Sequence, residues 1–245
     1  MFILIWALGL YFTVYLSIYV IKKNREVGYT FLSVLLAGYI LISNILTPRL
    51  TSLNVGVTNL VIVTGSIIWP FTAQLSDMIN EVYGKKKTFF AIGFGYAVNL
   101  LFVLFVLMAN ETVAVWDGVK ETFWKEYFLP SWRVFIASSV SYIICQFIDV
   151  NIFSYLKEKY RADENKSKVL GVIGYSSLRS ALSDGVNMVF DAIIFAVIAF
   201  LFVLPTDSLL ELILGSILFK GIVSIIDTPL FALFRVKIRN IERHE

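Results

Sequence analysis

Seven long apolar stretches separated by short polar segments dominate the pattern of this chain. The hydrocarbon core of a membrane is about 30 Å thick, and about 20 helical residues cross it. The pattern therefore predicts an all-α, polytopic membrane bundle with spans at residues 2–21, 29–48, 57–80, 88–109, 132–156, 186–204 and 209–234. Residues 169–185 begin with polar positions, so we expect a separate re-entrant or interfacial helix there, before the sixth span.

Ionisable residues interrupt the later apolar stretches. Those that would lie at membrane depth are Asp77, Asp149, Asp191, Lys220 and Asp227. An ionisable side chain at that depth costs at least roughly 2.5–3.5 kcal/mol, so it persists only where it faces a partner, a cavity or a transport pathway. The sequence therefore predicts a polar site inside the bundle.

Polar residues also repeat at helical spacing in four of the predicted helices, which places them on one face of each helix. The repeats are Gln74, Asp77 and Glu81; Gln146 and Asp149; Arg179, Ser183, Asn187 and Asp191; and Lys220 with Asp227. Ion pairs that only hold the bundle together are one explanation for any single member. For the whole set we favour a cavity, because a partly satisfied ionic cluster is costly without a ligand or water.

Two prolines fall inside predicted spans, Pro70 in the third and Pro229 in the last. Each would remove one backbone hydrogen bond and free the carbonyl four residues earlier. Broken helices near the membrane midplane are typical of transporter sites, whereas a simple bend is the structural alternative.

Composition supports a membrane protein and narrows the chemistry. Hydrophobic residues make up 58% of the chain and charged residues 16%, with a mean hydropathy of +0.78. No polar segment is long enough to bury a core of its own, so we expect no soluble domain. One cysteine and one histidine give no metal site or internal disulfide, and no Gly-x4-Gly-Lys-Ser/Thr loop is present,.

The basic residues predict the orientation in the membrane. Lys and Arg gather on the side that holds residues 22–25, 85–87, 157–179 and 235–243, and only Arg49, Lys120, Lys125 and Arg133 fall opposite. Because positive residues favour the cytoplasm, we expect a cytoplasmic C-terminus and an external N-terminus. The first apolar stretch lacks a basic leader and a small-residue cleavage site, so it predicts a retained helix.

Four sequence blocks carry a family resemblance. They are Ser43-Asn44 with Thr47; Trp69-Pro70-Phe71, Asp77 and Asn80-Glu81-Val82-Tyr83-Gly84-Lys85-Lys86; Gln146, Asp149-Val150 and Ile152-Phe153; and Arg179, Ser183, Asp191 and Ile194-Phe195, with Lys220 and Pro229 in the last helix. In this order they resemble the queuosine precursor transporter family, also called the putative vitamin uptake transporters. The resemblance covers about residues 30–235. It implies six core helices in a domain at 28–245, with an additional N-terminal helix at 1–27.

The resemblance implies a non-enzymatic transporter that imports 7-deazaguanine bases, such as 7-cyano- or 7-aminomethyl-7-deazaguanine, through the cell membrane. The residues that we expect to bind the substrate are Asn44, Gln74, Asp77, Gln146, Asp149, Arg179, Ser183, Asn187, Asp191 and Lys220, with Trp69, Phe71, Phe147 and Phe195 as stacking candidates. A carboxylate can accept both donors of a guanine-like edge, and aromatic walls suit a planar base. No cofactor, metal or nucleic-acid partner is expected, and a homodimer is allowed.

The chain departs from the family pattern at Asp184, which stands where threonine is usual and would add a charge near the cytoplasmic mouth. Two other functions stay open on the sequence alone. One is the substrate-binding membrane subunit of an energy-coupled vitamin importer. The less favoured one is an intramembrane enzyme that uses a carboxylate pair such as Asp149 and Asp191, although the Gly-x-Gly-Asp block of such proteases is absent.

Overall fold

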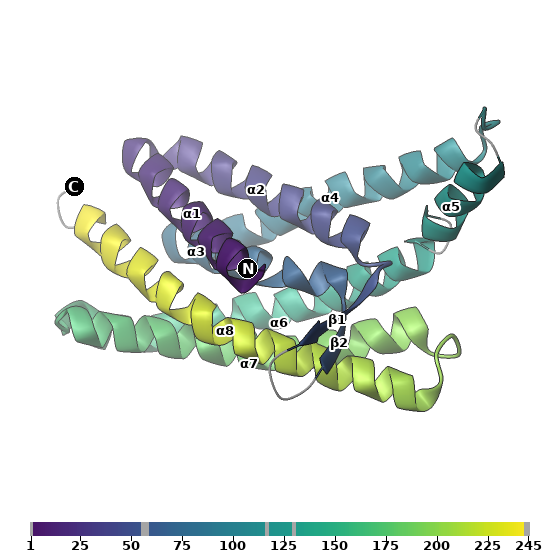
Figure 1. Cartoon of the computed structure of the whole chain (residues 1–245). Helices are drawn as coiled ribbons and strands as arrows, with labels where there is room; N and C mark the ends of the chain where they lie inside the picture. Colours follow the sequence, from purple (N-terminus) through teal and green to yellow (C-terminus); the bar gives the residue numbers. More distant parts are fainter. Residues whose placement is uncertain (1, 55–58, 116–117, 129–130, 243–245) are drawn as a thin grey trace.

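The computed structural model describes residues 2–54, 59–115, 118–128 and 131–242 of the chain (Figure 1). Its elements follow in the order α1 (Phe2–Lys23), α2 (Arg25–Leu46), β1 (Leu50–Asn54), β2 (Asn59–Val63), the short 3₁₀ helix η1 (Thr64–Ile67), α3 (Trp69–Tyr83), α4 (Lys85–Asn110), α5 (Gly118–Phe128), α6 (Ser131–Lys166), α7 (Val169–Phe200) and α8 (Thr206–Glu242). Long helices make up nearly all of this arrangement.

Six helical segments of the described chain are long and apolar enough to cross a membrane. They correspond to α1, α2, α4, α5 with α6, α7 and α8. At about 1.5 Å per residue, α6, α7 and α8 each exceed the roughly 30 Å hydrocarbon core, so their ends extend beyond it. The chain is therefore a multi-pass helical membrane protein.

The third predicted span, residues 57–80, is not one helix. Residues 57 and 58 lie outside the described part. From Asn59 the chain forms β2, which pairs antiparallel with β1 so that Leu50 lies opposite Val63, and it then continues through η1 into α3. A short apolar run rich in β-branched residues, such as Val61-Ile62-Val63, looks the same to a hydropathy scan whether it forms a strand or a helix.

The helix α3 has 15 residues. At about 1.5 Å per residue it is roughly 22 Å long, too short to cross the hydrocarbon core alone. Every residue from Trp69 to Glu81 is buried. Non-helical backbone at membrane depth is tolerated only where protein covers it, and β2 is covered by α8, with Ile62 fully buried.

The two prolines behave differently from each other. Pro70 lies in the first turn of α3, where the missing N–H costs no helical hydrogen bond, so the expected break at Pro70 is wrong,. Pro229 lies inside α8, as predicted. The separate helix expected at 169–185 is also wrong, because α7 is continuous from Val169 to Phe200.

The polar character of residues 169–185 has a different cause. Ser176, Arg179, Ser180 and Ser183 are all buried in the bundle, so these residues form an interior face of α7 instead of an interfacial segment. The helix α7 packs along both α6 and α8, while α2 packs against α4, α3 and α1. A division of the chain at residue 27 stays a prediction.

The helix ends separate the basic residues as the sequence predicted. The α1–α2, α3–α4 and α6–α7 connections and the end of α8 lie at one end of the bundle, and the α4–α5 and α7–α8 connections lie at the other (Figure 1). The first end carries Lys22, Lys23 and the run from Lys85 to Lys87. We call it the basic end.

Candidate functional site

A cavity lies within the bundle on the side away from the basic end. Residues of α2, η1, α3, α4, α6, α7 and α8 line it. The polar and aromatic lining residues are Ser43, Asn44, Thr47, Ser66, Trp69, Thr72, Tyr96, Ser138, Tyr142, Asp191, Phe195, Ser216 and Lys220. Five of the residues predicted from the sequence are among them, namely Asn44, Trp69, Asp191, Phe195 and Lys220.

An ion pair between α7 and α8 forms the charged part of this cavity. Lys220 Nζ donates to Asp191 Oδ2, and the other carboxylate oxygen accepts from the Ser141 hydroxyl at 2.6 Å. The Lys220 ammonium also lies 5.1 Å from the centre of the Trp69 ring, within cation–π range,. The cavity therefore presents a positive and a negative group beside an aromatic surface.

Aromatic and amide groups complete the walls. Tyr96 and Tyr142 lie against each other with their ring centres 5.4 Å apart, and Phe195 lines the cavity from α7. The Asn44 amide nitrogen donates to Ile40 O of its own helix at 3.1 Å, and no described group donates to its side-chain oxygen. A planar ligand with both donors and acceptors suits such a lining.

The other two stacking candidates lie elsewhere. Phe147 is 62% exposed on the lipid-facing side and packs against Phe89. Phe71 packs against Trp6 and Tyr39 in the core beside α1. Neither side chain lines the cavity, because Phe71 points into the core beside α1 and Phe147 lies on the exposed face of α6.

The turn η1 closes the cavity against α2. The Ser43 hydroxyl donates to Gly65 O at 3.0 Å, and Thr47 Oγ1 donates to Ser43 O at 2.7 Å. A Cβ on Gly65 would lie 2.6 Å from Ser43 O and would also collide with Thr47 Oγ1. The absence of a side chain at Gly65 therefore allows the turn to reach the Ser43 and Thr47 side of the cavity.

A second set of predicted residues forms a buried layer behind the cavity. It contains Gln74, Asp77, Gln146, Asp149, Ser183 and Asn187, each at most 3% exposed. Gln146 accepts from the Ser76 hydroxyl at 3.1 Å. With its amide nitrogen toward α8, Gln74 donates to Asp227 Oδ1 at 2.6 Å and accepts from Phe231 N at 3.1 Å. All six residues are buried inside the bundle, but none of them lines the cavity.

Asp184 belongs to this layer as well. It is 1% exposed and accepts from the Ser180 hydroxyl at 3.1 Å. The expectation that it would lie near the cytoplasmic mouth is therefore wrong, because Asp184 lies about four turns from Val169, the residue at which α7 starts at the basic end,.

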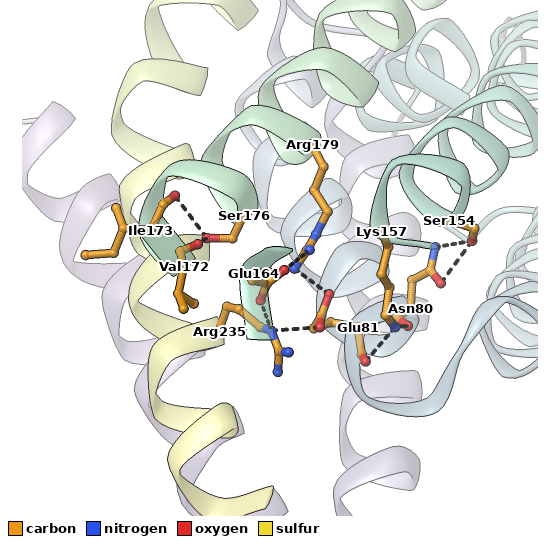
Figure 2. A network of polar contacts seen from close by, with 10 residues as sticks. All are labelled: Asn80, Glu81, Ser154, Lys157, Glu164, Val172, Ile173, Ser176, Arg179 and Arg235. Carbon is orange, nitrogen blue, oxygen red and sulfur yellow. Dashed lines mark hydrogen bonds and ion pairs between the residues drawn. The ribbon is translucent and has the colours of Figure 1, made fainter. Parts of the chain in front are cut away.

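A third layer, an ionic network, lies nearer the basic end (Figure 2). Arg179 donates to Glu164 at 2.6 Å and to Glu81 at 2.7 Å, and Arg235 lies 2.7 and 3.0 Å from the same two carboxylates. Lys157 donates to the backbone oxygens of Asn80 and Glu81 at 2.8 Å. Arg179, predicted as a substrate ligand, is therefore engaged outside the cavity.

The three layers follow the same order along each helix. On α7 the order is Asp191, Asp184 and Arg179, and on α8 it is Lys220, Asp227 and Arg235. From Asp191 to Asp184 is roughly 10 Å along the helix axis, and from Asp184 to Arg179 roughly 7 Å. The cavity, the carboxylates and the ionic network are thus stacked along the direction in which the helices cross the membrane.

Sequence reasoning missed several residues of these layers. Tyr96, Tyr142 and Ser216 line the cavity, and Glu164 and Arg235 complete the network. Hydroxyl-bearing residues are common in membrane helices and gave no signal by themselves. Glu164 and Arg235 lie beyond the predicted spans, where charged residues are expected at the surface. The block at 157–168 contains three acidic residues, and the sequence does not show that Glu164 is the one that faces inward.

Comparisons with known proteins place the chain among membrane transporters. The model of a family described as "Putative vitamin uptake transporter" matches residues 63–234. A relative named "Probable queuosine precursor transporter", from Bacillus subtilis (strain 168), is 28% identical over 183 residues, which is 73% of this chain and 74% of that protein. No solved structure matches.

Proposed function

The chain belongs to the putative vitamin uptake transporter family, and from this premise we propose that it imports a queuosine precursor, a 7-deazaguanine-type base, across the cell membrane. The relative in Bacillus subtilis carries the name of such a transporter. The proposed substrate site is the cavity, with Asn44, Asp191 and Lys220 as polar ligands and Trp69 and Phe195 as walls. We propose that the basic end faces the cytoplasm.

The observation that carries this proposal is the Asp191–Lys220 pair beside Trp69 in a cavity of the bundle. A deazaguanine presents a ring N–H beside an amino group, and one carboxylate can accept both. Its carbonyl oxygen needs a donor, which Lys220 can supply. Each charged group of the pair thus has a counterpart on the base, and the flat ring can stack on Trp69 or Phe195.

The ion pair also explains how the cavity tolerates its charges. A lone carboxylate in a low-dielectric interior is costly, but here Lys220 and Ser141 occupy both oxygens of Asp191,. A ligand that carries its own donors can replace part of these contacts without leaving a charge unpaired. A ligand without them would cost free energy, which is a basis for selectivity.

A second candidate function is the substrate-binding membrane subunit of an energy-coupled vitamin importer. The family description, which names vitamin uptake, favours it. Liposomes that contain only this protein discriminate the two, because a complete transporter equilibrates the base across the membrane by itself and a binding subunit does not. A homodimer stays a prediction, to be checked by light scattering of the detergent-solubilised protein.

An intramembrane enzyme has less support. Asp149 and Asp191, the carboxylate pair considered from the sequence, lie in different layers, and Asp191 is engaged by Lys220. Among the described residues, no three Asp, Glu, Cys or His side chains lie close enough together to hold a metal ion. A transporter needs neither a catalytic carboxylate pair nor a metal site.

The experiment that tests the proposed function is thermal stabilisation of the purified protein with 7-cyano-7-deazaguanine, 7-aminomethyl-7-deazaguanine, queuine, guanine and a set of vitamins. A ligand at 100 times its Kd stabilises by about 2.7 kcal/mol, which is a shift of several degrees. We expect a saturable shift with a deazaguanine and a smaller one with guanine, which has the same hydrogen-bonding edge but lacks the 7-substituent. The shift should disappear in Asp191→Asn and persist in Asp207→Asn, an exposed carboxylate at the start of α8. A shift with a vitamin alone contradicts the proposal.

A further inference from the structure

Four aspartates from four helices meet behind the cavity. They are Asp77 on α3, Asp149 on α6, Asp184 on α7 and Asp227 on α8, and each is at most 2% exposed. Asp77 interacts electrostatically with the other three, and Asp184 interacts with Asp149 and Asp227. We call these four residues the acidic layer.

The described cations near the acidic layer already bond to groups outside it, Lys157 to the backbone oxygens of Asn80 and Glu81 and the others to carboxylates. Lys220 bonds to Asp191 on the cavity side, and Arg179 and Arg235 bond to Glu81 and Glu164 on the basic side. The ionic network therefore balances two guanidinium groups with two carboxylates, whereas the acidic layer holds four carboxyl groups of the same sign. Four carboxyl groups buried together in a low-dielectric interior cannot all stay ionised, because their like charges repel one another.

Several carboxyl oxygens of the acidic layer have no hydrogen-bond donor among the described residues. Among the described residues, neither oxygen of Asp149 has a hydrogen-bond partner, nor does one oxygen each of Asp77 and Asp184. Ser183 faces Asp149, but its hydroxyl donates to Ser180 O at 3.2 Å instead. Carboxyl groups without donors around them retain a proton more readily than they retain a charge.

A second, independent feature points to a mobile partner at this place. The Asn187 side chain is 1% exposed, and neither its nitrogen nor its oxygen has a described partner. Asn187 lies three residues after Asp184 and four after Ser183, so all three occupy one face of α7. The Asn187 amide can both donate and accept a hydrogen bond. It can therefore bind a protonated carboxyl group, or a water that carries a proton to one.

Tyr142 connects the acidic layer to the cavity. It lines the cavity and interacts electrostatically with both Asp191 and Asp149. Its hydroxyl is buried and has no described partner. A hydroxyl that both donates and accepts can relay a proton between the two sites.

The other titratable groups around the acidic layer are uncharged in their usual form. They are Tyr142 and Cys145 on α6, beyond which lie the Asp191–Lys220 pair on one side and the ionic network with Lys157 on the other. No three described carboxyl, cysteine or histidine groups are arranged to hold a metal ion. The arrangement therefore favours a proton over a metal cation.

We propose that the acidic layer is a proton-binding site, loaded from the cavity through Tyr142, and that proton release toward the basic end accompanies substrate import. On loading, the Tyr142 hydroxyl gives its proton to a carboxylate of the acidic layer and regains one from water in the cavity, so that one O–H bond forms for each that breaks. Within the layer a proton passes from a carboxylic acid to a neighbouring carboxylate, and on release it passes to water at the basic end. The coupling to import rests on the proposed function. The presence of bound protons in the layer does not depend on it.

Infrared spectroscopy of the purified protein in lipid tests the bound protons directly. Protonated carboxyl groups have a C=O stretch distinct from that of carboxylates. We expect such a band at neutral pH, decreased in Asp149→Asn and in Asp77→Asn and unchanged in the surface control Asp207→Asn. If the wild-type protein has no protonated carboxyl band at neutral pH, or if both layer variants leave it unchanged, the acidic layer holds no proton and the inference is wrong.

Proteoliposomes test the coupling. One proton per neutral 7-cyano-7-deazaguanine allows an accumulation of about tenfold for a pH difference of one unit. We expect wild-type accumulation that a protonophore abolishes, and in Asp149→Asn exchange of the base without gradient-driven accumulation. Wild-type accumulation that ignores the pH gradient overturns the coupling. If no deazaguanine binds at all, the proposed function fails, and the infrared result still decides whether the layer binds protons.

Discussion

At the scale of single residues, Lys220 brings the charged and the aromatic parts of the cavity together. It donates to Asp191 and lies over the Trp69 ring. The sequence suggested a stripe of Lys220 with Asp227, two turns apart on α8, but these two residues face different layers. Lys220 acts at the cavity, and Asp227 binds Gln74 behind it.

Replacing Lys220 with methionine keeps the length of the side chain and removes its charge. A hydrogen bond to a charged group contributes about 1.5–3 kcal/mol, so we expect a deazaguanine to bind at least about tenfold more weakly. Calorimetric titration of the purified variant measures the change. Lys22→Met, on an exposed residue at the end of α1, is the control, and an unchanged Kd in Lys220→Met contradicts the role of the ammonium.

Glycine at position 65 matters because of space alone. A Cβ there would collide with Thr47 Oγ1 and Ser43 O, whereas a Cβ on Gly93 in α4 meets nothing within 4 Å. We expect Gly65→Ala to push η1 away from α2, to lower the melting temperature by several degrees and to reduce uptake. Gly93→Ala should have a neutral or slightly stabilising effect, because alanine reduces the freedom of the unfolded chain. Equal melting temperatures for the two variants contradict this account.

At the scale of elements, the short helix α3 determines where the polar layers meet. Its buried face carries Trp69 at the cavity, Asp77 in the acidic layer and Glu81 in the ionic network. Because η1 and the β1–β2 hairpin replace the first part of a span, α3 begins in the interior and can present all of its sides to other helices. A full-length membrane helix would leave one side to lipid.

The ionic network joins four helices near the basic end, as Figure 2 shows for Glu81, Glu164, Arg179 and Arg235. In Glu164→Gln two buried guanidinium groups share one remaining carboxylate. Removing one partner of a buried ion pair costs about 3–5 kcal/mol, so we expect a melting temperature lower by several degrees. Glu158→Gln, an exposed position on the same helix, should melt like the wild type. A wild-type melting temperature in Glu164→Gln would mean that the network contributes no stability.

Opening toward the basic end requires this network to separate. The network lies beyond the acidic layer on every one of the four helices, so a substrate that moves from the cavity toward the basic end passes it last. Its two guanidinium groups are paired with two carboxylates, which makes the closed arrangement stable yet able to re-form,. The cavity side has no comparable set of ion pairs among the described residues.

At the scale of the whole molecule, the layers give the protein a direction. The cavity lies away from the basic end. The α1–α2, α3–α4 and α6–α7 connections, which carry most of the Lys and Arg residues, lie together at that end (Figure 1). We predict that the basic end is cytoplasmic. A substrate taken from outside would then enter the cavity first and leave past the ionic network.

Labelling with a membrane-impermeant maleimide tests this orientation. In a background with Cys145 replaced by serine, we expect Glu111→Cys to react in intact cells and Lys86→Cys to react only after the cells are broken. Both positions are exposed, and they flank the two ends of α4. The reverse pattern of reactivity would mean that the chain is inserted the other way around.

The sequence by itself determined the class of the molecule and the depth of its polar residues. Long apolar runs favour helices in lipid, and Asp, Lys and Arg inside them must face protein, so the six long helices among the seven predicted spans and the buried positions of Asp77 and Asp149 could be predicted,. The side on which the basic residues gather was equally legible, because short connections must alternate between the two ends.

Tertiary structure alone decided how those residues are divided among sites. Hydropathy does not separate a buried hairpin and a short helix from one long span, so the third crossing was misread. Helical spacing gives the face of a residue on its own helix but not the height at which it meets another helix. For this reason one predicted polar site became a cavity with Asp191 and Lys220, an acidic layer and an ionic network that binds Arg179, each set by where four helices of different lengths cross.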